Sequence, residues 1–289
     1  MFVKTRNFAT DALDKFRELQ RRSFGILELT ASTLKAGQSE MDVARLLMRR
    51  YRDAGAGSFF HLPVVLFGAR TALPGDWSIR DFYPKKDVLL KEGDSVILDA
   101  APLFDGYLVD TSYSFCSGQN PVHRRMMQNL AEFRDDVRDS VSYGRRFKSI
   151  ADSVAARMRD MGYEPVHTKH PGEVLGHRTL KAGKLPFEWR IQGLDGLSLG
   201  WFMLKGKLAN AGLTRKAPTW NNGATSDHEP HDGLWLVEPH AANGAVGAKW
   251  EEILVIEDGK ARWLDDDVPH VRQWAQIAEG GEYQPRQGN

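Results

Sequence analysis

Two aspartates, Asp99 and Asp110, flank a short β-prone segment and have the spacing of residues that could bind a metal ion. Asp99 ends the apolar run 96–98, and a turn at 104–107 leads into a second β-prone run that reaches Asp110. The pattern predicts a β-hairpin with both carboxylates near facing positions. A carboxylate in an apolar strand is costly unless it is paired, hydrogen-bonded or bound to a cation, and two together repel each other. A metal ion is the natural partner for the pair.

Two glutamates in the last third of the chain have a similar setting. Glu238 ends the apolar run 234–237, and Glu251 precedes the apolar run 253–256. With the aspartates and one histidine they make a ligand set suited to two divalent ions of the manganese, iron, cobalt or zinc kind. Carboxylates can bridge ions about 4 Å apart, because their charge offsets the repulsion between the cations. Glu252 competes with Glu251, but strand alternation points the two to opposite faces, so only one can bind.

The elements that must hold these residues follow an α+β order. Helical periodicity predicts helices over 11–34 and 39–53 before the hairpin, and over 121–141 and 147–161 after it. Strands are expected over 62–67, 234–239 and 250–256, with a hairpin turn at 257–260. The segment 178–233 is Gly-rich and reads as irregular, with Trp189, Trp201 and Trp220 expected to pack in a core or a dimer contact.

Composition narrows the class of protein. The 289 residues, 42% of them hydrophobic, can form one large core, in one domain or two. The 39 basic and 38 acidic residues nearly cancel, which removes the general electrostatic argument for a nucleic acid or a membrane surface as partner. The single cysteine, Cys116, excludes an intramolecular disulfide and a thiolate cluster. Residues 1–30 contain no signal-like apolar region, and we expect a soluble cytoplasmic protein without a membrane span.

In combination these features resemble the pita-bread metallopeptidases, the family of methionine aminopeptidase, aminopeptidase P and prolidase. That family carries Asp, Asp, His, Glu and Glu in this chain order, with the aspartates eleven residues apart across a Gly-Tyr hairpin, as at Asp99 and Asp110. Its ligand histidine is followed seven residues later by a second histidine, as His170 is by His177. Its Glu-Pro pair is matched at Glu238. Its last acid precedes a β run that ends in acid-Gly, as does Glu251.

The resemblance implies a single pita-bread domain over 1–289, an α+β fold whose curved, mainly antiparallel sheet is covered by paired helices, with an atypical insertion at about 178–233. It implies a hydrolase of a peptide or small amide bond, Xaa-Pro-type peptidase-like, in which water bridging two divalent ions (Mn, Co, Fe or Zn) attacks the carbonyl. Glu238 would take the proton and His177 would hold the carbonyl side, with His228 as a further catalytic candidate. The implied metal ligands are Asp99, Asp110, His170, Glu238 and Glu251.

Two departures from the family pattern point to an unusual substrate. Members usually place a histidine shortly before the first ligand aspartate, where this chain has the segment 81–84 without one. They often read Thr-Arg after the second aspartate, where this chain has Ser112-Tyr113. Two alternatives therefore stay open: a hydrolase of a non-peptide C–N bond in a small metabolite, and a catalytically silent binding protein. A homodimer is also left open.

Overall fold

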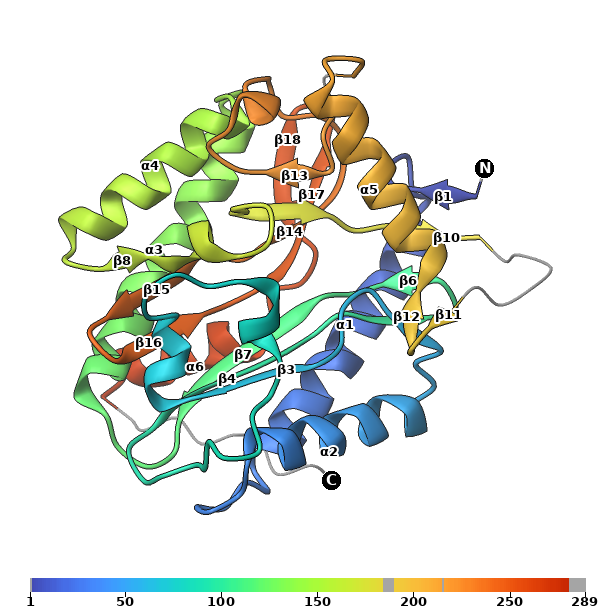
Figure 1. The fold of residues 1–289 in the computed structure, drawn as a ribbon. Helices are drawn as coiled ribbons and strands as arrows, with labels where there is room; N and C mark the ends of the chain where they lie inside the picture. The colour runs from blue at the N-terminus through green and yellow to red at the C-terminus, as the bar shows by residue number, and fades with distance from the viewer. Residues whose placement is uncertain (1, 184–189, 215, 281–289) are drawn as a thin grey trace.

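The computed structural model describes residues 2–183, 190–214 and 216–280 (Figure 1). Its α-helices are α1 (Thr10–Ala31), α2 (Glu40–Asp53), α3 (Pro121–Ser142), α4 (Phe147–Asp160), α5 (Gly196–Asn210) and α6 (Pro269–Ala278). Short 3-10 helices are η1 (Gly68–Ala72), η2 (Ile79–Phe82), η3 (Val166–Lys169) and η4 (Ala224–Ser226). The strands of the first half are β1 (Val3–Lys4), β2 (Ser58–Phe59), β3 (Val64–Phe67), β4 (Ser95–Ala100), β5 (Pro102–Phe104), β6 (Tyr107–Leu108), β7 (Thr111–Cys116), β8 (Glu164–Pro165) and β9 (Gly176–Arg178). Those of the second half are β10 (Lys181–Ala182), β11 (Arg190–Ile191), β12 (Leu194–Asp195), β13 (Thr219–Trp220), β14 (Gly233–Val237), β15 (His240–Asn243), β16 (Val246–Lys249), β17 (Glu252–Glu257) and β18 (Lys260–Trp263).

Helices α1 and α2 cover an antiparallel sheet of order β3-β4-β7. Buried apolar positions recur along α1 at helical spacing, for example Leu13, Phe16 and Leu19, and pack against β4 and β7 in one core. Helix α2 begins where the side chain of Ser39 accepts a hydrogen bond of 3.1 Å from the amide of Asp42, which satisfies one of the free N–H groups of the first turn. Both predicted helices are confirmed, the first ending three residues earlier than expected.

The predicted hairpin between Asp99 and Asp110 is confirmed, but its strands are split between two sheets, which the sequence did not indicate. Strands β4 and β7 pair with each other, while β5 and β6 at the tip belong to a different sheet. Asp105 and Gly106 both have positive φ, 48° and 83°, as a tight two-residue hairpin turn requires. A Cβ on Gly106 would lie 2.3 Å from the carbonyl oxygen of Ala182, so glycine is also needed for the approach of β10.

The second half of the chain forms a sheet of order β13-β9-β14-β17-β18, with α3 and α4 beside it (Figure 1). Alternate residues of β14 face two different cores: Leu234 and Leu236 join the core of α1 and α2, while Trp235 and Val237 join that of α3 and α4. Trp250 belongs to the second core, where its indole donates to the Leu130 carbonyl at 3.1 Å. The expected hairpin at 257–260 is confirmed by the β17–β18 pairing.

The prediction of irregular structure over 178–233 is wrong for the middle of that segment, because Gly196–Asn210 form helix α5 (Figure 1). The helix contains glycines, which are poor helix formers, and its apolar residues are not confined to one face. The sequence therefore lacks the alternation of apolar and polar residues by which a helix is recognised. Trp220 packs in the core, stacked on Phe147 with ring centroids 4.1 Å apart, and Trp201 is half-buried. Trp189 lies outside the described residues. No helix in the described part of the chain is long and apolar enough to cross a bilayer.

Candidate metal centre

Four buried carboxylates meet where the two halves of the chain join. Asp99 lies near the end of β4 and Asp110 directly before β7, whereas Glu238 follows β14 and Glu251 precedes β17. Each residue is at most 7% exposed. Strand pairing sets Asp99 opposite Ser112, and an isolated antiparallel bridge pairs Ser112 with Glu251. The structure thus brings together the four acids that the sequence predicted as a group.

Lys249 lies among these acids, a residue that the sequence analysis did not identify. Its Nζ donates to Asp99 Oδ2 at 2.6 Å, to Glu238 Oε2 at 3.0 Å and to Glu251 Oε2 at 3.1 Å. The lysine is 3% exposed. Burial opposes its charge, but these carboxylates outweigh the burial and raise the pKa of Lys249 well above its ordinary value.

His61 is the second residue that sequence reasoning missed. It lies between β2 and β3, and its Nε2 is 3.1 Å from Asp110 Oδ2 and 3.5 Å from Asp99 Oδ1. Its Nδ1 lies 3.0 Å from the carbonyl oxygen of Leu62, which can only accept, so Nδ1 carries a proton. The structure thus brings a histidine that is distant in sequence from the segment 81–84 to the two hairpin aspartates. The sequence feature that could have indicated His61 is its position directly before the predicted strand 62–67, which lies next to the hairpin in the sheet.

His177 approaches the same acids from β9. Its Nε2 lies 3.6 Å from Asp110 Oδ2 and 3.9 Å from both Glu238 Oε1 and Glu251 Oε1. Its Nδ1 donates to the carbonyl of Arg178 at 3.2 Å. Burial disfavours the charged ring, but Asp110 and Glu238 outweigh burial and raise the pKa of His177. His177 therefore presents one ring nitrogen, Nε2, to the acids.

Aromatic rings enclose the other side of His177. Phe60 stacks on it with centroids 5.8 Å apart, and Phe202 of α5 meets both His177 at 5.8 Å and Phe60 at 5.1 Å. The insertion therefore reaches the acid cluster through Phe202 of α5. These rings form an apolar wall next to the polar centre.

His170, the predicted ligand, is hydrogen-bonded through both ring nitrogens. Nδ1 lies 2.9 Å from Glu238 Oε2, and Nε2 lies 3.0 Å from Nδ1 of His240. His240 Nε2 is 2.7 Å from the carbonyl oxygen of Thr71, which can only accept. His240 therefore holds its proton on Nε2 and accepts at Nδ1, so His170 Nε2 donates. Both ring nitrogens of His170 are therefore engaged by neighbouring side chains, Glu238 and His240.

Glu251 and Glu252 point in opposite directions, as alternation predicted. Glu251 faces Lys249, whereas Glu252 accepts from Arg134 at 2.6 Å and lies 2.9 Å from His270 Nε2. Burial, and after it the Asp110 charge, raise the pKa of Glu251 well above its ordinary value. The structure therefore brings Glu251 to the acid cluster and ties Glu252 to α3 and α6.

His228, the further catalytic candidate, lies on another face of the sheet. Its ring contacts Phe147 at 5.5 Å and His231 at 4.8 Å, and its Nδ1 donates to the Glu229 carbonyl. Phe147 belongs to the core of α3 and α4, whereas Glu238 continues the alternation of β14 toward the other side. The structure does not bring His228 to the carboxylates.

Three carboxylate oxygens of the cluster lack a hydrogen bond among the described residues: Asp99 Oδ1, Asp110 Oδ1 and Glu251 Oε1. All three are buried, and a buried oxygen without a donor is costly. Asp110 forms one close group of candidate ligand atoms with His61 and Asp99, and another with His177 and Glu251. Oxygen and imidazole donors of this kind suit a divalent cation, so the residues fit a metal ion.

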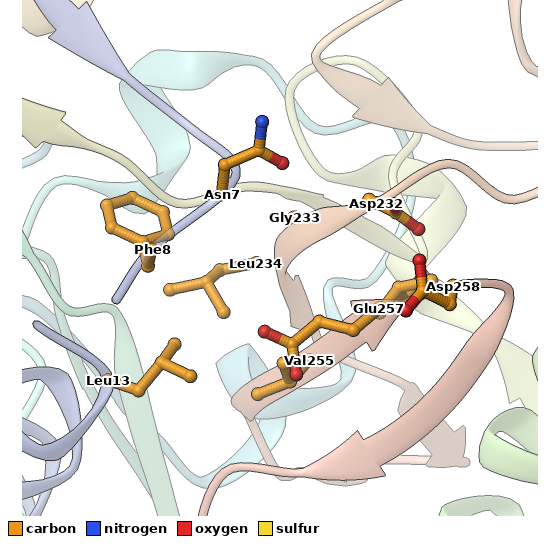
Figure 2. Close-up of a pocket in the computed structure, with 10 residues that line it drawn as sticks. Asn7, Phe8, Leu13, Asp232, Gly233, Leu234, Val255, Glu257 and Asp258 are labelled. Carbon is orange, nitrogen blue, oxygen red and sulfur yellow. The ribbon is translucent and has the colours of Figure 1, made fainter. Parts of the chain in front are cut away.

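A separate pocket of about 270 Å³ lies between the N-terminal segment and the β14–β17 pair (Figure 2). Phe8, Leu13 and Val255 contribute apolar side chains to it, and Glu257 and Asp258 contribute carboxylates. None of the predicted catalytic or metal-binding residues lines it. The candidate site is therefore the acid cluster and not this pocket.

This acid cluster and fold define a class of protein. The chain belongs to metallopeptidase family M24, whose model matches residues 14–258. Its fold is the pita-bread fold, because solved structures of that kind superpose on most of the chain. X-Pro aminopeptidase from Thermotoga maritima matches with a TM-score of 0.60 at 18% identity, covering 87% of this chain and 59% of that one. Prolidase from Pyrococcus horikoshii matches with a TM-score of 0.63 at 15% identity, covering 91% and 63%.

Curated relatives are methionine aminopeptidases. The enzyme of Thermococcus kodakarensis is 25% identical over 162 residues, which are 54% of this chain and 49% of that protein. That of Aquifex aeolicus is 20% identical over 172 residues, 57% of this chain and 66% of that protein. The chain thus spans about half to two thirds of the length of the curated relatives it matches.

Proposed function

We propose that this chain is a divalent-metal-dependent hydrolase of the peptide bond in short Xaa-Pro peptides. The observation that carries the proposal is the convergence of four buried carboxylates, three of which keep an oxygen without a hydrogen-bond donor among the described residues. An uncompensated group of acids in a protein interior is destabilising, and cation binding removes that cost. Membership of family M24 supports the same reading.

Asp99, Asp110 and Glu251 would hold the ion through carboxylate oxygens, with His61 and His177 beside them. The sequence assigns Glu238 and His170 to the ligand set as well. When bound, such an ion supplies Lewis acidity that activates water and polarises a carbonyl group. Glu238 Oε1, 3.9 Å from His177 Nε2, would accept a proton, and His177 Nε2 would hold the substrate carbonyl oxygen.

The Xaa-Pro preference is supported by the apolar wall and by the relatives. Phe60 and Phe202 lie against His177 and offer ring surfaces that suit a proline side chain and exclude water. Among the similar solved structures are proteins named X-Pro aminopeptidase and prolidase. Methionine is the competing N-terminal residue, since the curated relatives are methionine aminopeptidases.

The test is a substrate panel on the full chain after loading with Mn²⁺ or Co²⁺. Peptides with N-terminal methionine, Xaa-Pro dipeptides and tripeptides, and small free amides are compared, with Asp110→Asn as the inactive control. We expect release from Xaa-Pro peptides by the wild type only. Release from free amides alone would support a non-peptide C–N hydrolase instead. No release from any substrate, together with no bound ion, would support a silent binding protein.

A further inference from the structure

The ammonium group of Lys249 is placed as a cation would be. An ammonium has three N–H donors, and here each of them has a carboxylate acceptor: Asp99, Glu238 and Glu251. These acceptors are three of the five ligands that the sequence assigns to a pair of ions. An ion bound to the same three oxygens would have to displace the lysine, because a metal–oxygen bond of about 2.0–2.2 Å leaves no room for both.

The backbone of Lys249 is held where the side chain has to reach the acids. Ser114 of β7 accepts from the Lys249 amide at 2.9 Å and donates to the Lys249 carbonyl at 2.6 Å. On the other side β16 pairs with β15, with Lys249 opposite His240. Both sides of the lysine backbone are therefore fixed, and the buried side chain reaches Asp99, Glu238 and Glu251 from this position.

The histidines divide the cluster into two parts. His61 and His177 each turn Nδ1 to a backbone carbonyl and Nε2 to Asp110, and His61, the nearer of the two, has the arrangement of a metal-ligating histidine. His170 has Glu238 on one nitrogen and His240 on the other. The oxygens without a donor, on Asp99, Asp110 and Glu251, belong to the part that contains His61 and His177.

We propose that Lys249 takes the place of a second metal ion, so that the centre binds one divalent ion per chain, at Asp110 between His61 and His177. This inference rests on the proposed metal-dependent function and replaces the two ions expected from the sequence. It assigns Lys249 a positioning role, since the ammonium holds Asp99, Glu238 and Glu251 in the orientation that a second ion would otherwise impose.

The test counts ions. Full-length protein is stripped with a chelator, equilibrated with excess Mn²⁺, desalted, and analysed for metal and protein content, with electron paramagnetic resonance to distinguish an isolated Mn²⁺ from a coupled pair. Lys249→Met removes the charge at similar length, and Lys249→Arg keeps it. We expect one ion and an isolated signal for the wild type and Lys249→Arg, and two ions with a coupled signal for Lys249→Met.

The wild-type count decides the proposal even if Lys249→Met fails to fold, which circular dichroism would reveal. Two ions in the wild type would overturn the role of Lys249 and leave metal-dependent hydrolysis standing. One ion in both the wild type and a folded Lys249→Met protein would also overturn it. A count of zero in every protein would overturn the proposed metal-dependent function itself.

Discussion

Ser112 of β7 and Glu251, an acid of the second half of the chain, face each other across an isolated antiparallel β-bridge. The bridge follows directly from the hairpin, because Ser112 is also the partner of Asp99. One residue thus connects an acid from each half, and the geometry of the centre depends on the register of both sheets.

Glu251→Gln and Glu252→Gln are expected to have opposite effects. Glu251→Gln removes a carboxylate that faces Lys249 and that has one buried oxygen without a hydrogen-bond donor among the described residues. The bound ion should therefore be lost while the fold is retained. The second breaks the contacts of the buried Glu252 with Arg134 and His270, which should lower the free energy of unfolding by roughly 3–5 kcal/mol and leave the ion count unchanged. Metal analysis and chemical denaturation measure both. An unchanged ion count in Glu251→Gln would contradict the assignment.

His61→Gln should lower the affinity for the metal ion by at least roughly 10–100-fold, which is the loss typical when a residue that hydrogen-bonds to a metal ligand is removed. The reason is that His61 Nε2 lies 3.1 Å from Asp110 Oδ2, closer than His177 Nε2 at 3.6 Å. Isothermal titration of the metal-free protein with Mn²⁺ gives the affinity. His123→Gln is the matched control, since His123 is buried in α3 away from the acids, and its affinity should equal that of the wild type. Equal affinities in all three proteins would exclude His61 as a ligand.

Acid should destabilise the protein through His123. Burial lowers the pKa of His123 from its ordinary value to about 4. The unfolded chain binds a proton at this residue below about pH 6.5 and the folded chain does not, so the contribution of His123 to stability is complete above about pH 6.5 and is lost as the pH falls toward 4. Denaturation curves at several pH values should show a shallower decline for His123→Gln than for the wild type. Parallel declines would contradict the assignment.

Phe202→Ala should impair substrate binding more than turnover. Phe202 lies against Phe60 and His177 in the apolar wall, and one aromatic contact with the substrate is worth about 0.5–1.5 kcal/mol, so its loss should raise KM for Xaa-Pro peptides by roughly two- to tenfold. Steady-state kinetics separates KM from kcat. Leu204→Ala, on the same helix but 56% exposed, should leave both constants unchanged. A rise in KM for Leu204→Ala of the same size would mean that α5 as a whole, and not Phe202, determines the effect.

The acids were predictable because their signals are local. Asp99 and Asp110 are joined by one hairpin whose turn is encoded by Asp105 and Gly106, and strand alternation separates Glu251 from Glu252. Helices with a clear polar face, such as α1 and α3, were also predictable. In these cases the residues that decide the structure lie close together in the sequence.

His61 and Lys249 could not be predicted in the same way. His61 reaches Asp110 only because β3 pairs with β4, and Lys249 looks like an ordinary strand-end lysine until β15 and β16 fold against β7. Their roles depend on how three sheets meet. The helix α5 was missed for a different reason, because an apolar helix rich in glycine lacks the period by which helices are recognised.

Trp250 stands between Lys249 and Glu251 in the chain but points to the opposite side, where its indole stacks on His270 at 5.4 Å and meets Trp263 at 5.5 Å. The two neighbours of this fluorophore are thus the lysine and the glutamate of the acid cluster. Because one peptide bond joins Trp250 to Lys249 and another joins it to Glu251, a movement of either residue should change the surroundings of the buried indole. The protein therefore carries an intrinsic optical probe of its own centre, and Trp250→Phe identifies its share of the emission.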